Sequence, residues 1–183
     1  MNSSHGKDAG RAGLRRAAAL IMPVLMLPAW PVTAVTKTAS VGFNATLVAA
    51  CSAGTTSNGV VSFGTLDFGT TSFLSRPINV TGQQNAGAIR LQCNNGTAWR
   101  VLLNGGNSGS TASRYLVGGP TAQRVTYNLY TNAAYTTVWD NVTGVSGTGN
   151  GQIIYLPVYG RIPAQATPSV GNYSDTVQVT VSW

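Results

Sequence analysis

One stretch near the N-terminus, residues 40–51, constrains the fold of this chain more than any other part. Apolar side chains alternate along it with small or polar ones. This is typical of an extended strand, because successive side chains of a strand point to opposite faces. One face carries Val41, Phe43, Ala45, Leu47, Ala49 and Cys51. A terminal strand with a continuous apolar face must be buried in a groove, either of its own domain or of a neighbouring molecule.

Residues 1–34 have the pattern of a secretory signal peptide. Arginines precede an apolar segment at residues 17–27, and small residues at 32–34 form a signal peptidase site. The alternative, a membrane anchor, is disfavoured because prolines interrupt the apolar segment and a span needs about 20 residues. We therefore expect an exported chain, with no membrane insertion after cleavage.

The charge of the exported part argues against a nucleic-acid partner. Four of the eleven basic residues and one of the four acidic residues lie in residues 1–34, so the net charge falls from +7 to +4. The remaining basic residues are scattered singly, whereas nucleic-acid binding needs a clustered basic stripe. The remaining chain is long enough for one domain with its own core.

The chain has two cysteines, Cys51 and Cys93, both in the exported part. An isolated pair in an oxidising compartment most simply forms a disulfide. The alternative, a metal site or reactive thiol, lacks partners because the single histidine, His5, is removed with the signal peptide. We predict a disulfide that closes a loop of about 40 residues.

The exported part shows no helical periodicity. Four Asn-Gly pairs begin at Asn58, Asn95, Asn104 and Asn150, and this pair is a strong hairpin signal. Between the turn signals lie short runs with a period of two, at residues 60–63, 76–81, 89–93, 99–103, 125–129, 153–158 and 173–183. This spacing predicts an all-β sandwich or barrel in a single domain.

Two further expectations follow from the same pattern. The glycine-rich segments 104–112 and 144–151 are predicted to be loops. Several aromatic side chains fall in register with aliphatic strand positions, and we expect them in the core: Trp99, Tyr127, Tyr155, Tyr173 and Trp183. The alternative is an aromatic platform on which a sugar stacks, as in a carbohydrate-binding module.

Groups that could perform catalysis are scarce after residue 34. That part contains no histidine, no glutamate, one lysine and three aspartates, Asp67, Asp140 and Asp175. A Ser-His-Asp triad cannot be built without histidine. Asp67 lies at a strand or turn edge, Asp140 precedes a loop, and Asp175 follows a turn where Asx hydrogen bonding is expected. We therefore expect no enzyme activity, no catalytic or metal-binding residues and no cofactor.

Three groups of motifs carry a resemblance to a known family. The alternating strand is followed by residues 63–69 (FGTLDFG). A second group comprises residues 87–93 (GAIRLQC), Trp99-Arg-Val101, residues 127–130 (YNLY) and Trp139. The third comprises residues 159–165 (YGRIPAQ) and 171–181 (GNYSDTVQVTV). In these motifs the chain resembles the spore coat protein U domain family, whose best-understood members are subunits of archaic, Csu-type chaperone–usher pili. It departs from the family pattern at Ser52-Ala53 and at Asp140.

The resemblance implies an immunoglobulin-like β-sandwich that is incomplete and is completed by an N-terminal donor strand. After the signal peptide at residues 1–34, it implies a donor strand at residues 35–50 and the sandwich domain at residues 51–183. The side chains that enter a neighbour's groove would be Val41, Phe43, Ala45, Leu47 and Ala49. The C-terminal strand that lines the acceptor groove would contribute Tyr173, Val177, Val179, Val181 and Trp183.

The partners that the resemblance implies are a periplasmic chaperone, an outer-membrane usher and neighbouring identical or related pilin subunits. The chain would pass through the periplasm to the cell surface, as a pilus (fimbria) subunit that supports adhesion and biofilm formation. Two alternatives remain open. One is a spore or cell-surface coat protein of the same family that forms no fibre, and the other is a monomeric secreted carbohydrate-binding module.

Overall fold

The structure is a computed structural model that describes residues 37–57 and 60–183. The predicted signal peptide therefore lies outside the described residues. The chain divides after Asn44, and residues 45–183 form the folded domain. The preceding residues, 37–44, are exposed and contain no secondary structure. None of the helical structure in the described ranges is long and apolar enough to cross a bilayer.

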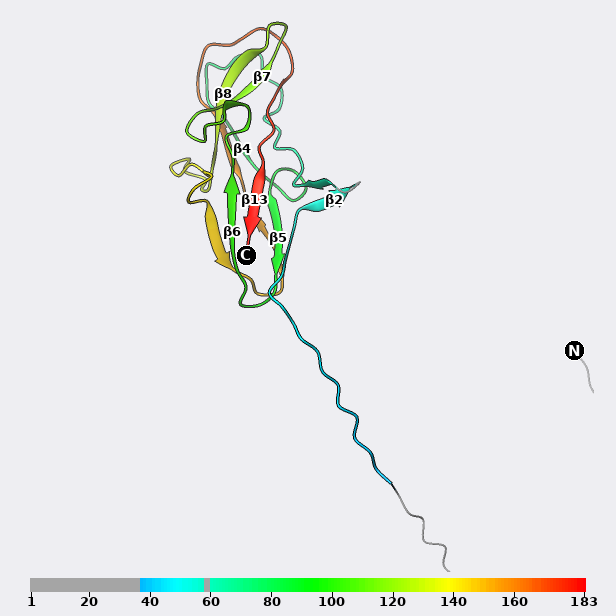
Figure 1. Cartoon of the computed structure of the whole chain (residues 1–183). Coiled ribbons are helices and arrows are strands. Elements are labelled where there is room, and N and C mark those ends of the chain that lie inside the picture. Colours follow the sequence, from blue (N-terminus) through cyan, green and yellow to red (C-terminus); the bar gives the residue numbers. More distant parts are fainter. Residues whose placement is uncertain (1–36, 58–59) are drawn as a thin grey trace, which may run out of the picture. The chain divides into compact units, whose positions relative to one another are not determined.

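The domain is built from short strands and one 3₁₀ turn (Figure 1). In chain order the described elements are β1 (Cys51–Ala53), β2 (Thr55–Ser57), β3 (Val60–Ser62), β4 (Ile78–Thr81), β5 (Ile89–Cys93), β6 (Ala98–Leu103), η1 (Gly106–Ser108), β7 (Arg114–Gly118), β8 (Gln123–Tyr130), β9 (Val145–Thr148), β10 (Ile153–Leu156), β11 (Tyr159–Ile162), β12 (Tyr173–Ser174) and β13 (Val179–Ser182).

All of the strand pairs in the described residues are antiparallel, and they form four sheets. The largest has the order β12-β7-β8-β11-β4. Two three-stranded sheets have the orders β1-β5-β10 and β13-β6-β9, and β2 pairs with β3 in a hairpin. The connection between β2 and β3, at Asn58-Gly59, lies outside the described residues, but the pairing of Ser57 with Val60 agrees with the predicted hairpin.

The core is formed by alternate residues of several strands, as the period of two predicts. The inward side chains come from β5 (Ile89, Leu91, Cys93), β6 (Trp99, Val101, Leu103) and β8 (Val125, Tyr127, Leu129). They join Leu74, Trp139, Val158 and Ile162 in one buried cluster. Since these strands belong to three different sheets, the sheets enclose a common core, and the prediction of an all-β sandwich is confirmed.

Gln165 is the last residue of the motif at residues 159–165, and its hydrogen bonds give that motif a structural role. Its side-chain amide donates to the carbonyl of Thr126 at 2.8 Å and accepts from the N–H of Thr126 at 3.0 Å. Its own N–H donates to the carbonyl of Leu74 at 2.8 Å. Strand β11 ends just before Pro163, which has no N–H to donate. The glutamine side chain therefore continues the hydrogen bonding along β8 where β11 stops.

Arg114 is a structural residue that the sequence pattern does not distinguish from the scattered surface cations. Its side chain is fully buried. It donates to the carbonyls of Asn104 (2.9 and 2.7 Å), Leu103 (3.3 Å) and Trp139 (2.8 Å), and to Oδ1 of Asn128 (2.6 Å). Burial lowers the pKa of this guanidinium, and the nearby Tyr127, Asp175 and Asp140 oppose that shift. Arg114 thus ties the end of β6 to β8 and to the segment around Trp139.

The prediction of a loop at residues 144–151 is wrong, because β9 (Val145–Thr148) lies within it and pairs with β6. Gly147 faces Trp99 across the pair, and a Cβ at Gly147 would collide with the indole ring. The glycine that suggests a loop instead gives the tryptophan room to lie over the strand, so packing overrides propensity.

Three of the Asn-Gly pairs do not form hairpins. Asn104-Gly105 leads from β6 into η1 and on to β7, which belongs to another sheet. The other two lie close together. Asn95-Gly96 connects β5 to β6, and Asn150-Gly151 connects β9 to β10, and in each case the two strands belong to different sheets. The two turns bond to each other, because Gly96 donates to the carbonyl of Gly149 at 2.9 Å. They therefore make the corner where the chain changes sheets.

The expected aromatic core is only partly correct. Trp99 and Tyr127 are buried, but Tyr155 is 36% exposed and Trp183 is 61% exposed, and Tyr173 is half-buried. The run at residues 173–183 is also split into β12 and β13, because residues 175–178 are bonded to the segment around Asn104 and η1. An alternating pattern identifies the faces of a strand but does not show which face is covered.

Candidate polymerisation groove

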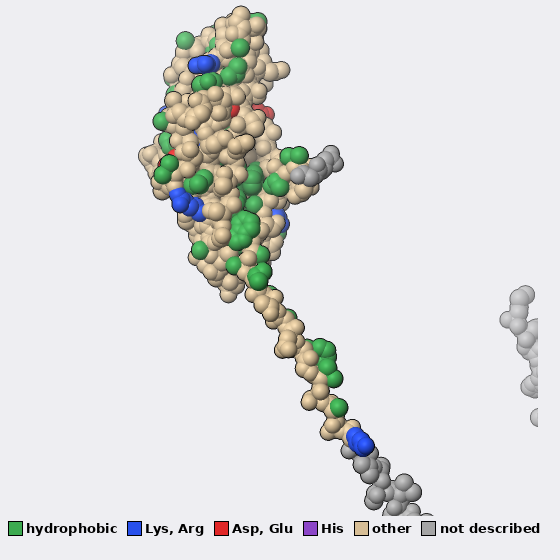
Figure 2. All heavy atoms as spheres, viewed as in Figure 1, with side chains coloured by type: hydrophobic (Ala, Val, Ile, Leu, Met, Phe, Trp, Pro, Cys, Tyr) green, Lys and Arg blue, Asp and Glu red, His purple; other side chains and the backbone are tan. Residues whose placement is uncertain are grey.

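An apolar groove opens into the core of the domain. It consists of two adjoining cavities of about 700 and 800 Å³. The cavities share lining residues, which include Leu66, Phe68, Leu116 and Asp175, so they form one continuous depression. In Figure 2, apolar side chains gather on the face over β13, between it and the β2–β3 hairpin.

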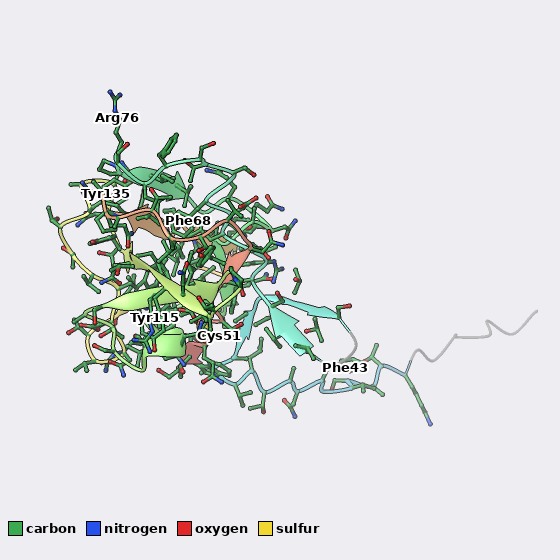
Figure 3. The ribbon with its side chains drawn as sticks, turned by 90° about the horizontal axis from the view of Figure 1, so that it is seen from above. Phe43, Cys51, Phe68, Arg76, Tyr115 and Tyr135 are labelled. Atoms are coloured by element: carbon green, nitrogen blue, oxygen red, sulfur yellow. A yellow bond between two sulfur atoms is a disulfide. The ribbon has the colours of Figure 1, made fainter. Side chains whose placement is uncertain are left out.

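One wall of the groove is the segment at residues 65–68. Among the residues that the structure describes, its backbone N–H and C=O groups form no hydrogen bonds. Leu66 and Phe68 pack against the core, and Figure 3 shows Phe68 among the strands. A Cβ on Gly160 would lie 2.8 Å from Leu66 and 2.9 Å from Phe68, so this glycine lets the segment lie close against β11. The wall is held by side-chain packing, and its backbone is left without strand partners.

The opposite wall is β13 together with the residues that precede it. β13 is an end strand, and its one strand partner in the described part of the chain is β6. Val177 and Val179 line the second cavity, as do Val60 and Val61 of β3, which is likewise an end strand. The second cavity is therefore bordered by two strand edges that lack a partner in the described chain. An unpaired edge beside an apolar depression is the feature that binds an added strand.

The floor of the groove is the core itself. Side chains from β5, β6 and β8, all buried, line the second cavity: Ile89, Leu103, Tyr127 and Leu129. Val158, also buried, completes this lining. Since the interior of a protein is normally packed without voids of this size, the sandwich is missing side chains that would fill it.

A partly buried hydrogen bond lies where the two cavities meet. The hydroxyl of Tyr127 donates to Oδ2 of Asp175 at 2.7 Å, and the N–H groups of Asn107 and Thr176 donate to Oδ1 at 2.7 Å each. Burial, followed by this hydrogen bond, raises the pKa of Tyr127 far above its usual value. The contact with Asn107 joins η1 to the segment that leads into β13, so Asp175 fixes the position of this wall.

The other two aspartates have the turn roles expected of them. Oδ1 of Asp67 accepts the N–H of Gly69 at 2.8 Å. Oδ1 of Asp140 accepts the N–H groups of Val142, Thr143 and Gly144, and these bonds lower the pKa of its carboxyl group. Within residues 37–57 and 60–183, no three side chains of His, Cys, Asp or Glu converge as metal ligands would.

The predicted groove residues are distributed unevenly along the two cavities. Val177 and Val179 line the second cavity, and Tyr173 lines the first. Val181 packs against the core cluster, and Trp183 lines neither of the two cavities. The sequence pattern gave no sign of the wall at residues 65–68, although the motif at residues 63–69 contains it.

The predicted donor-strand residues are all exposed: Val41, Phe43, Ala45, Leu47 and Ala49. Phe43 is 91% exposed and Leu47 is 87% exposed. The structure contains no strand at residues 37–50, so the expected strand from residue 40 onward is not formed, and regular pairing begins at Cys51. An apolar row of this kind that remains exposed has no partner among residues 37–57 and 60–183.

The predicted disulfide is present. Cys51 and Cys93 are bonded, and they lie directly opposite each other in the β1–β5 pair. The bond therefore anchors the start of the domain, at the point where residues 37–50 join it, to a buried strand.

A family model for the Spore Coat Protein U domain matches residues 37–180. The match covers most of the chain, so the chain belongs to this family, and the family predicted from the sequence motifs is confirmed. No curated protein sequence matches the chain.

Three solved structures are similar to the chain. One is the CsuC–CsuE chaperone–tip adhesion subunit pre-assembly complex from archaic chaperone-usher Csu pili of Acinetobacter baumannii (16% identity, TM-score 0.46, 75% of this chain and 41% of that chain). Another is the P pilus rod subunit PapA (19% identity, TM-score 0.41, 79% of this chain and 99% of that chain). The third is a chaperone–tip adhesin complex of CFA/I fimbriae biogenesis (15% identity, TM-score 0.35, 72% of this chain and 42% of that chain). The chain thus spans less than half the length of two of these three proteins.

Proposed function

We propose that this protein is a structural subunit of a surface pilus, assembled by the chaperone–usher pathway through donor-strand exchange. The observation that carries the proposal is the pairing of an unfilled apolar groove with an unpartnered apolar segment in the same chain. Each subunit can then donate and accept one strand. Such a contact is heterologous and propagates as a filament.

The energetics favour this use of the groove. Burial of Val41, Phe43 and Leu47 in a neighbour would contribute about 5–9 kcal/mol, at about 1.5–3 kcal/mol for each side chain. Backbone hydrogen bonds to the open edge of β13 and to residues 65–68 would hold the donor strand parallel to the groove and fix its register. Until that strand arrives, the groove is an aggregation hazard. This supports the involvement of a periplasmic chaperone that fills it first and an outer-membrane usher that receives the subunit.

The positions of the strand ends support a head-to-tail arrangement. The disulfide-anchored start of β1 lies opposite Cys93, beside the turn into β6, and Ser182 lies opposite Arg100 near the start of β6. The root of the donor segment and the end of β13 are therefore at the same end of the domain. A donor strand that comes from a subunit at the other end would run antiparallel to β13.

The groove and the apolar segment also bear on catalysis, on export and on the coat-protein alternative. We assign a structural and not a catalytic function, with export of residues 35–183 to the cell surface and a contribution to adhesion and biofilm formation. The coat protein of the same family is the second candidate, because a groove and a donor segment can also cross-link a surface layer without a long fibre.

Deletion of residues 35–47 tests the proposal while sparing the residues next to Cys51. The truncated subunit should still bind its chaperone, because the groove is intact. It should fail to form oligomers that resist SDS, because it has no strand to donate. Oligomer ladders of unchanged length from the truncated protein would contradict the proposed function.

A further inference from the structure

The residues that join the exposed N-terminal segment to β1 are bonded to the domain in an unusual way. Strand β5 pairs with β1 as far as Cys93 and Cys51. Beyond this pair, the N–H of Asn94 donates to the carbonyl of Ala50 at 3.0 Å. The ladder of β1 and β5 therefore continues by one step past the disulfide.

The side chain of Asn94 then extends this ladder further. Its Nδ2 donates to the carbonyl of Val48 at 2.8 Å. The β5 backbone cannot make this bond, because it turns away at Asn95-Gly96, where the N–H of Thr97 donates to the carbonyl of Asn94 at 3.0 Å. The amide side chain thus supplies the donor that the N–H of residue 96 would have supplied in a continued strand, because the bonded pairs of an antiparallel ladder recur at every second residue.

We infer that Asn94 is a positioning residue that holds residues 48–50 against their own domain, so that the stretch available to a neighbour ends at Leu47. This inference rests on the proposed function and deepens it. The carbonyls of Val48 and Ala50 are used within the domain, so Ala49 between them stays at the root and does not reach a neighbour's groove. Val41, Phe43, Ala45 and Leu47 form the exchanged face.

The consequence for a fibre is mechanical. A strand that is free up to the disulfide would let successive subunits swivel about several backbone bonds. With residues 48–50 fixed by Asn94 and Cys51 fixed to Cys93, the swivel is confined to the residues before Val48. Asn94 therefore sets how widely the angle between neighbouring subunits can vary.

The experiment compares Asn94→Ala and Asn94→Asp with Asn95→Ala in the mature chain. Aspartate has nearly the size of asparagine but cannot donate from its carboxylate. Asn95 is equally exposed, and its side chain forms no hydrogen bond among the described residues, which makes it the matched control. ¹⁵N relaxation should give order parameters near 0.85 for Val48 and Ala49 in the wild type and in Asn95→Ala, and values below about 0.6 in both Asn94 variants. Ala50 should stay ordered in all of them, because the backbone N–H of Asn94 still binds its carbonyl.

Fibres imaged by electron microscopy supply the second measurement. Fibres of the Asn94 variants should have a shorter persistence length than those of the wild type and of Asn95→Ala. The inference fails if the order parameters or the persistence lengths of the Asn94 variants match those of Asn95→Ala. A wild-type chain that forms no fibres would instead contradict the proposed function, and the order parameters would still decide the role of Asn94.

Discussion

Tyr127 couples the stability of this domain to pH through a single proton. Burial and the hydrogen bond to Asp175 raise its pKa above the usual value of 10.0, so the folded state retains the phenol proton more tightly than the unfolded state. The stabilisation is fully present below about pH 10 and is lost as the pH rises further, at about 1.4 kcal/mol per pH unit. Tyr127→Phe should remove this dependence and cost about 1 kcal/mol near neutral pH.

Urea unfolding between about pH 7 and about pH 11, followed by tryptophan fluorescence, measures both effects. Tyr115→Phe is the control, because it removes a phenol hydrogen bond to the carbonyl of Asn107 that is exposed. It should leave the alkaline loss of stability in place. An equally steep alkaline loss in Tyr127→Phe would show that other groups cause it.

Phe43 is the residue on which donation should depend most. It is the largest side chain of the donor face and is 91% exposed in its own chain. Phe43→Asp would place an unpaired charge in an apolar groove, at a cost of several kcal/mol, so fibre formation should collapse. The domain should remain folded, because Phe43 does not contribute to its core.

Val48→Asp is the matched control for that substitution. Val48 is also exposed, at 72%, but its side chain lies on the opposite face of an extended segment from Phe43. Electron microscopy should show fibres for Val48→Asp and none for Phe43→Asp, with similar melting temperatures for the two chaperone-bound subunits. A monomeric carbohydrate-binding module would need Phe43 for its own stability, and an unfolded Phe43→Asp subunit would favour that alternative.

At the scale of the elements, the sequence predicts strand faces better than it predicts strand partners. The buried faces of β5, β6 and β8 follow from a period of two, and the disulfide follows from an isolated cysteine pair. Strand β9 could not be predicted, because its glycine is required by contact with Trp99, which is distant in sequence. Arg114 was missed for the same reason, since most of its acceptors are backbone carbonyls that only the folded chain brings together.

In the groove, too, the sequence predicts which face of a strand is apolar but not which strands lie side by side. The donor face is visible in the sequence because it is a local alternation of side chains. The wall at residues 65–68 is defined by backbone groups that have no partner in the described chain, and no local pattern marks an absent partner. The C-terminal residues were predicted as one continuous strand lining the groove, and the break at residues 175–178 depends on the bonds that Asp175 and Gln178 make to residues near Asn104.

At the scale of the whole molecule, the proposed function describes a sandwich whose missing strand is supplied by another copy, so supplying that strand in cis should complete it. A second copy of residues 37–47 attached after Trp183 through a linker of about four residues would enter the groove antiparallel to β13, as a hairpin does. The short linker suffices because, in the proposed arrangement, the N-terminal end of the donor lies near the end of β13. This chain should be monomeric and stable without a chaperone, because its groove is filled.

Size-exclusion chromatography and thermal melting test this prediction. The extended chain should not accept a strand from another subunit, and it should melt well above the same chain in which the phenylalanine of the appended copy is replaced by aspartate. The matched pair differs at one side chain, so linker and length effects cancel. If the two chains melt at the same temperature, the appended strand does not occupy the groove. Either the antiparallel direction or the assignment of residues 41–47 as the donor face would then be wrong.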